Sequence, residues 1–187
     1  MNKIVMGATG CLLVLMPNGA RAEKADSTKR TEILADSAAV DDVKQIRTLT
    51  GNVELTRGTL IMKAGKAVVT QDPEGYQFAT FNAVPGGLAT FRQKRDGGDL
   101  WVEGQAERIE YDGKQELVKL FSKAKLARLE GAKKTDEVEG AFISYDSRKE
   151  FFAVENSASG ASKPGGGRVK IVIEPANKGA AAAPGKP

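Results

Sequence analysis

The amino-acid sequence predicts an all-β protein, built as an elongated antiparallel roll of many short strands. Apolar and polar residues alternate along stretches such as LTGNVELTRGTLIMKAGKAVV at residues 49–69, as they do in strands with one buried face. Turn signals separate these stretches, and they comprise DPEG at 72–75, PGG at 85–87, DGGD at 96–99, DGK at 112–114 and KKTD at 133–136. A third observation is that several segments share one pattern, which indicates a repeated unit.

The first 22 residues have the order of a secretory signal peptide. Lys3 precedes an apolar run over residues 4–16, and Ala20-Arg21-Ala22 supplies the small residues of a cleavage site after Ala22. Cys11 preceded by Gly10 leaves a lipoprotein signal open as an alternative, although cleavage there would divide the apolar run. The sequence therefore predicts export, followed by a charged, flexible leader over residues 23–30.

The composition of the remaining chain excludes several classes of function. The chain has no histidine, and its one cysteine lies in the predicted signal peptide, which excludes Ser-His-Asp triads, cysteine nucleophiles and nearly all zinc or copper sites. No calcium-loop motif is present, so we predict neither a cofactor nor a metal site. Without the signal, 26 basic and 24 acidic residues remain interspersed, which is not the charge distribution of a nucleic-acid-binding protein.

The remaining 165 residues are enough for one core, and we expect a single domain over residues 31–175. The segment 114–131 has a helix-like composition, but its neighbours read as strands, and we interpret it as two strands bent near Ser122. A flexible loop follows Asn156, a last strand lies within 168–175, and residues 176–187 form a disordered Ala/Gly/Pro-rich tail.

The repeated pattern is an apolar residue, a small residue and a polar pair, followed by an apolar residue and Asp before a turn. It occurs in ILADSAAVDD at 33–42, VEGQAERIEYDG at 102–113 and VEGAFISYDS at 138–147. The two VEG copies begin 36 residues apart. We interpret each unit as a strand, a turn and a returning strand, stacked into a roll.

One face of these strands forms an apolar stripe that we expect to point inward. Its residues are Ile33, Leu49, Val53, Leu55, Leu60, Met62, Val102, Ile109, Tyr111, Leu117, Leu126, Ile143 and Phe152. Acidic residues such as Glu103, Glu107 and Glu110 lie at the alternate, polar positions, where solvation explains them better than catalysis does. Two interpretations of the stripe remain open, namely a closed sandwich core and two splayed sheets that leave a trough for lipid.

The quoted segments resemble the OstA family of periplasmic lipopolysaccharide-transport proteins. The resemblance covers residues 31–175 and rests on five segments in family order, which are ILADSAAVDD, LTGNVELTRGTLIMKAGKAVVT, GGLATFRQ, VEGQAERIEYD and VEGAFISYD. The chain departs from the family where relatives repeat a T-G-N-A motif, because it has FSKA at 121–124.

The resemblance implies a β-jellyroll whose two sheets form a twisted, open V around an apolar trough, with the inward stripe as its lipid-binding lining. It also implies that the protein has no enzymatic activity and shields the acyl chains of lipid A in the periplasm. Family members bridge an inner-membrane complex, through LptC, to the outer-membrane translocon LptD, by jellyrolls stacked head to tail. An exported scaffold with a closed core that binds no lipid is the alternative.

Stacking of this kind needs edge strands that remain free to pair. We predict that the first strand, Thr31–Ala35, and the last strand, Arg168–Ile173, lie at opposite ends of the roll and pair with partners. The side chains of interest there are Thr31, Ile33, Ala35, Val169, Ile171 and Ile173. Basic residues such as Lys63, Lys66 and Arg92 are candidates to meet phosphates at the mouth of a trough, although surface solvation explains them equally well.

Overall fold

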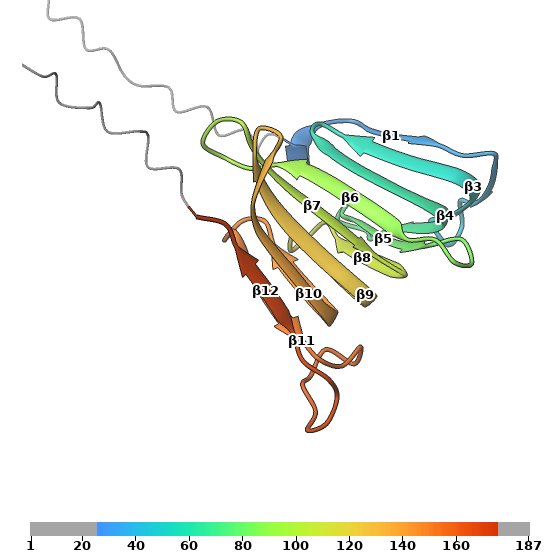
Figure 1. The fold of residues 1–187 in the computed structure, drawn as a ribbon. Coiled ribbons are helices and arrows are strands. Elements are labelled where there is room, and N and C mark those ends of the chain that lie inside the picture. The colour runs from blue at the N-terminus through green and yellow to red at the C-terminus, as the bar shows by residue number, and fades with distance from the viewer. Residues whose placement is uncertain (1–25, 176–187) are drawn as a thin grey trace, which may run out of the picture.

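The computed structural model describes residues 26–175, which form a short 3₁₀ helix and twelve strands (Figure 1). The helix is Asp26–Thr28, and the strands are β1 Thr31–Leu34, β2 Ser37–Asp41, β3 Ile46–Arg57, β4 Leu60–Gln71, β5 Gln77–Asn82, β6 Ala89–Lys94, β7 Leu100–Ala106, β8 Arg108–Asp112, β9 Leu117–Glu130, β10 Lys133–Asp146, β11 Phe151–Glu155 and β12 Lys170–Ile173. The predicted signal peptide and the tail at 176–187 lie outside the described residues. No helix within 26–175 is long and apolar enough to cross a membrane.

The strands form two layers that share four long strands. In the first layer the order is β1-β3-β4-β6-β7-β9-β10-β12, and Figure 1 shows these strands side by side. In the second layer the order is β2-β3-β4-β5-β8-β9-β10-β11. All pairings are antiparallel, and the predicted all-β jellyroll is confirmed.

The four long strands pass from one layer to the other along a line that we call the seam. In β3 the bend lies at Gly51 and Asn52, with φ of 79° and 44°, and the register with β4 shifts there. In β9 the bend lies at Ser122 and Lys123, with φ of 63° and 52°, and the register with β10 shifts in the same way. The predicted bend near Ser122 is therefore correct, although the two halves belong to one continuous strand.

The twelve strands are two copies of one six-strand unit. In each unit two short strands pair with the two halves of the first long strand, and two further short strands pair with the two halves of the second long strand. The first unit is β1–β6 and the second is β7–β12. Strand β3 begins at residue 46 and β9 at residue 117, which is 71 residues later. The 36-residue spacing of the VEG copies is therefore not the structural period, because those copies lie in β7 and β10, which are not equivalent strands.

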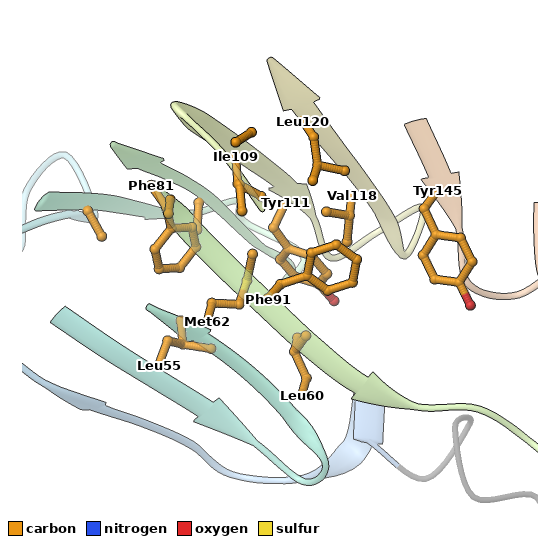
Figure 2. Close-up of a cluster of buried hydrophobic side chains, with 14 of the residues drawn as sticks. Leu55, Leu60, Met62, Phe81, Phe91, Ile109, Tyr111, Val118, Leu120 and Tyr145 are labelled. Atoms are coloured by element: carbon orange, nitrogen blue, oxygen red, sulfur yellow. The ribbon is translucent and has the colours of Figure 1, made fainter. Parts of the chain in front are cut away.

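The core lies between the two layers, because alternate residues of both layers point toward one another (Figure 2). Leu60, Met62, Phe81, Ile109 and Leu120 are completely buried there. A fully buried side chain of this size contributes about 1.5–3 kcal/mol, so this layer-to-layer packing is the main source of stability in the fold.

Candidate functional site: the interior between the layers

Twelve of the thirteen residues predicted to point inward do belong to the interior. Ten of them are buried core residues, namely Leu49, Val53, Leu55, Leu60, Met62, Val102, Ile109, Tyr111, Leu126 and Ile143. The other two, Ile33 and Phe152, are partly buried and pack against this core from its two ends. The alternation of apolar residues identified this lining correctly because each strand has one buried face.

The prediction for Leu117 is wrong. It lies opposite Asp112 and Asp146 on the outer face of the second layer, whereas its neighbours Val118 and Leu120 are buried in the interior. The stretch LVKL begins with two apolar residues in succession, and either could start the inward alternation. A one-residue error of this kind moves a side chain to the opposite face of the sheet.

The inward prediction also missed two phenylalanines that fill the centre. Phe81 is completely buried and Phe91 is 2% exposed. Phe91 fits because Gly104 faces it from the neighbouring strand, where an added Cβ would lie 2.1 Å from the ring. The alternation in QFATFN and ATFRQK contained this signal, but both strands are short.

The interior is closed in the middle and apolar but exposed at its two ends. At one end Val40 is 58% exposed. It lies opposite Arg47, which lies opposite the buried Val69, so Val40 is on the inward face of the second layer. At the other end Ile171 is 56% exposed and lies opposite the buried Val138. The lining therefore continues to both edges of the roll, where nothing within the described chain covers it.

On the side opposite the seam, which we call the mouth, polar contacts join the two layers. Thr31 donates a hydrogen bond to Gln77 at 2.9 Å, and Arg95 forms an ion pair with Glu150. Arg57 donates to the hydroxyl of Tyr111, and its guanidinium carbon lies 5.1 Å from the centre of that ring. Burial raises the pKa of the Tyr111 hydroxyl above its ordinary value of 10.0, while Arg57 opposes part of this rise, so the phenol stays neutral.

The basic residues proposed for the mouth lie elsewhere. Lys63 pairs with Glu54 at 2.8 Å, and Arg92 pairs with Glu103, both on the outer face of the first layer. Lys66 is exposed beside the bend of β4 at the seam. Of the two explanations given for these residues, surface solvation is the one that their positions favour, because strand alternation gives the face of a residue but not which end of a bent strand reaches the mouth.

The two predicted edge strands do lie at opposite edges of the first layer. Strand β1 ends at Leu34, so Ala35 lies just beyond it, and β12 begins at Lys170, so Arg168 and Val169 precede it. The two ends of the roll expose large apolar side chains, namely Leu34 of β1 and Val40 of β2 at one end, and Phe151 of β11 and Ile171 and Ile173 of β12 at the other. Among residues 26–175 no cluster of three or more acidic, His or Cys side chains could hold a metal ion.

Comparison with known proteins gives one consistent family. The family described as LptA/(LptD N-terminal domain) LPS transport protein matches residues 32–151. The chain is 31% identical to the lipopolysaccharide export system protein LptA of Haemophilus influenzae over 80% of this chain and 81% of that protein. It is 36% identical to LptA of Escherichia coli K12 over 51% of this chain and 50% of that protein.

A solved structure has the same fold. It is LptH of Pseudomonas aeruginosa, described as the LptA-homologous periplasmic component of the lipopolysaccharide transport device. The TM-score is 0.70 at 25% sequence identity, and the match covers 81% of this chain and 99% of that one.

Proposed function

Because the chain belongs to the LptA/LptD N-terminal domain family of lipopolysaccharide transport proteins, we propose that it carries lipopolysaccharide across the periplasm with the lipid A acyl chains held between its two layers. In this proposal the signal peptide is removed after Ala22, residues 31–175 act as a single carrier domain, and the chain catalyses no reaction. The observation that supports it most is the continuous apolar lining, which is closed at the centre and exposed at both ends.

The energetics of the cargo require such a lining. Transfer of one acyl chain of about 12 carbons into water costs on the order of 10 kcal/mol, at about 0.8 kcal/mol per methylene. Several chains per molecule make unassisted passage through an aqueous compartment negligible. Aliphatic side chains and Met62 suit such cargo, because they contact flexible chains without demanding hydrogen-bond geometry.

In-cell photo-crosslinking tests the lipid site. A photoreactive residue at Leu55, Met62 or Ile109 should form adducts with lipopolysaccharide, because these side chains point into the interior. The matched controls are Glu54 and Lys63, which lie next to Leu55 and Met62 but point outward. Adducts only at the two outward positions would contradict the carrier proposal and favour the closed scaffold.

The proposal extends to head-to-tail self-association, and the six-strand repeat supports it. Inside the chain the first unit joins the second by β5 pairing with β8 and β6 pairing with β7. The equivalents of β8 and β7 in the first unit are β2 and β1, and the equivalents of β5 and β6 in the second unit are β11 and β12. The internal junction is therefore a template for β11 and β12 of one copy pairing with β2 and β1 of the next.

This template gives the register between copies. Phe91 lies opposite Gly104 at the internal junction, and the equivalents of these residues are Ile171 and Ile33. Ile171 of one copy should therefore lie opposite Ile33 of the next, both facing the interior. The apolar lining would then continue from copy to copy without a gap.

Paired cysteines test this register. The predicted mature chain contains no cysteine, so Ile33→Cys combined with Ile171→Cys should give disulfide-linked ladders under mild oxidation. Glu32→Cys with Ile171→Cys is the matched control, because a shift of one residue places the thiol on the opposite face. Proline at alternate positions of Arg168–Ile173 should abolish association and leave the monomer folded. Ladders of equal yield from both cysteine pairs, or association unaffected by proline, would contradict the template.

The same free edges suit the two membrane partners. We propose that one edge pairs with an LptC-type component of the inner membrane and the other with an LptD-type translocon of the outer membrane. Strand addition at an edge uses only backbone hydrogen bonds for affinity, so one geometry serves a second copy and both partners.

A further inference from the structure

A polar pocket of about 490 Å³ lies at the mouth, between the first layer and the turns of the second. Its lining includes Thr31 and Arg57 from the first layer, and Gln77, Lys114 and Arg148 from the second. Lys29 and Glu116 complete its charged groups. Four basic side chains against one acidic side chain make the pocket a candidate site for an anion.

Arg57 is the residue that marks this pocket as more than a charged surface. It occupies an inward position of β3 and is only 9% exposed. One guanidinium nitrogen donates to Tyr111, but its buried Nε has no hydrogen-bond partner within the described residues. A buried guanidinium is costly unless its donors are used, and its planar fork matches the oxygens of a phosphate.

The second unit repeats part of this arrangement, because it also has an arginine at an inward position beside an aromatic ring, but this arginine has an acidic partner. Arg128 lies 71 residues after Arg57, and its guanidinium carbon is 5.0 Å from the centre of the Phe152 ring. It faces Asp136 at 3.1 Å. Strands β3 and β9 are four strand spacings apart in the first layer, or about 19 Å at roughly 4.8 Å per spacing. In a row of copies, arginines would therefore recur at the inner edge of the mouth.

On the outer face of the first layer, the comparable guanidinium is that of Arg92, and it has an acidic partner. There Arg92 pairs with Glu103 and stacks over Trp101, with its guanidinium carbon 4.3 Å from the ring centre. In the mouth pocket, Lys114 pairs with Glu74 outside the lining, which leaves Lys29, Arg57 and Arg148 against Glu116.

We propose that the mouth pocket around Arg57, Lys29 and Arg148 binds a phosphate group of the lipid headgroup while the acyl chains lie in the interior. This inference rests on the proposed function and adds a headgroup site to it. The pocket lies where the interior meets solvent, which is where the polar end of an amphiphile must lie once its chains are buried.

The test compares two probes in the same detergent micelles, namely an acylated glucosamine disaccharide with two phosphates and the same lipid with its phosphates removed. The wild-type protein should bind the phosphorylated lipid at least about tenfold more tightly, since one charge-assisted hydrogen bond is enough to account for that ratio. The double variant Lys29→Gln/Arg148→Gln and the single variant Arg57→Gln should lose most of this preference and retain affinity for the dephosphorylated lipid. Arg92→Gln is the matched control, and it should leave the preference unchanged.

The exposed pair Lys29 and Arg148 keeps the test valid if Arg57→Gln fails to fold. Equal affinity of the wild-type protein for both lipids would overturn the headgroup site and leave the carrier function intact. The headgroup site would also be overturned if Arg92→Gln lowered the preference for the phosphorylated lipid as much as the pocket variants do. Binding of neither lipid would contradict the proposed function itself. Inorganic phosphate that binds the pocket as tightly as the phosphorylated lipid would overturn the link to a headgroup.

Discussion

The two six-strand units of this protein have the same pairing scheme, but the strand edge that is paired in the first unit is unpaired in the second among the described residues. Strands β5 and β6 of the first unit are covered by β8 and β7, whereas their equivalents β11 and β12 have no further strand on their outer side within residues 26–175. Equivalent inward residues are therefore core in one unit and exposed in the other. The same alternating pattern therefore gives a buried residue where a further strand lies beside it and a more exposed residue where none does.

Truncation of equivalent inward residues should have different effects in the two units. Phe81 of β5 and Val154 of β11 occupy the same place in the two units, and only Phe81 is completely buried. Phe81→Ala should lower the free energy of unfolding by about 3–5 kcal/mol, measured by urea denaturation of the monomer. Val154→Ala should lower it by only about 1 kcal/mol, because its site is open on one side. Similar losses for both variants would show that the free edge is already packed as a core.

The two bends at the seam provide a second comparison, because the first unit uses Gly51 where the second uses Ser122. Gly51 has a φ of 79°, and an added Cβ would lie 2.1 Å from a carboxylate oxygen of Asp36. Gly51→Ala should lower the free energy of unfolding by about 2 kcal/mol, from backbone strain and displacement of Asp36. Gly86→Ala is the control for strain alone, since it has the same φ and nothing within 4 Å. A larger loss at Gly86 would contradict the packing component of this explanation.

The reverse substitution, glycine at the bend of the second unit, should stabilise the protein. Ser122 adopts a φ of 63°, which costs a residue with a Cβ about 1–2 kcal/mol relative to glycine. Ser122→Gly should therefore raise the melting temperature by an amount that corresponds to about 1 kcal/mol, after the higher entropy of glycine in the unfolded chain is subtracted. Ser122→Ala should give no gain, because it keeps the Cβ. A gain from Ser122→Ala alone would place the effect in the hydroxyl group instead.

The two units also differ in charge on the outer face, where Ile61 in the first unit and Glu137 in the second occupy equivalent positions. Hydrogen bonds from Lys125, at 2.6 Å, and Lys134 hold the pKa of Glu137 below its ordinary value of 4.5. A depressed pKa contributes stability above pH 4.5 that is lost as the pH falls through the folded-state value. Glu137→Gln should lower the free energy of unfolding at pH 7 by a few tenths of a kcal/mol. The variant should also show a smaller loss of unfolding free energy between pH 5 and pH 3, measured by urea denaturation. An unchanged dependence of this free energy on pH would contradict the role assigned to Glu137.

The sequence predicted the faces of the strands better than their partners. Alternation identified Leu55, Met62 and Ile109 as interior residues, because a buried face imposes a period of two on any strand. It failed at Leu117, where two successive apolar residues allow either phase. It also gave no sign of Arg57 at the mouth, since a lone basic residue at an inward position reads as a surface residue until its contacts with Tyr111 are known. The 71-residue duplication was missed because equivalent strands share their pairing but few of their residues.

The four strands that run through both layers restrict how the protein can change its width. Each layer continues covalently into the other at β3, β4, β9 and β10, so the layers cannot slide past one another or separate. The motion that this connection leaves open is rotation about the seam, which would break mouth contacts such as Thr31–Gln77 and Arg95–Glu150 and would widen the space toward the mouth. Such a rotation would change the width of the interior while the backbone hydrogen bonds within each layer stay intact. Because the two units are hydrogen-bonded side by side, a rotation that opens one unit would also tilt the layers of the other.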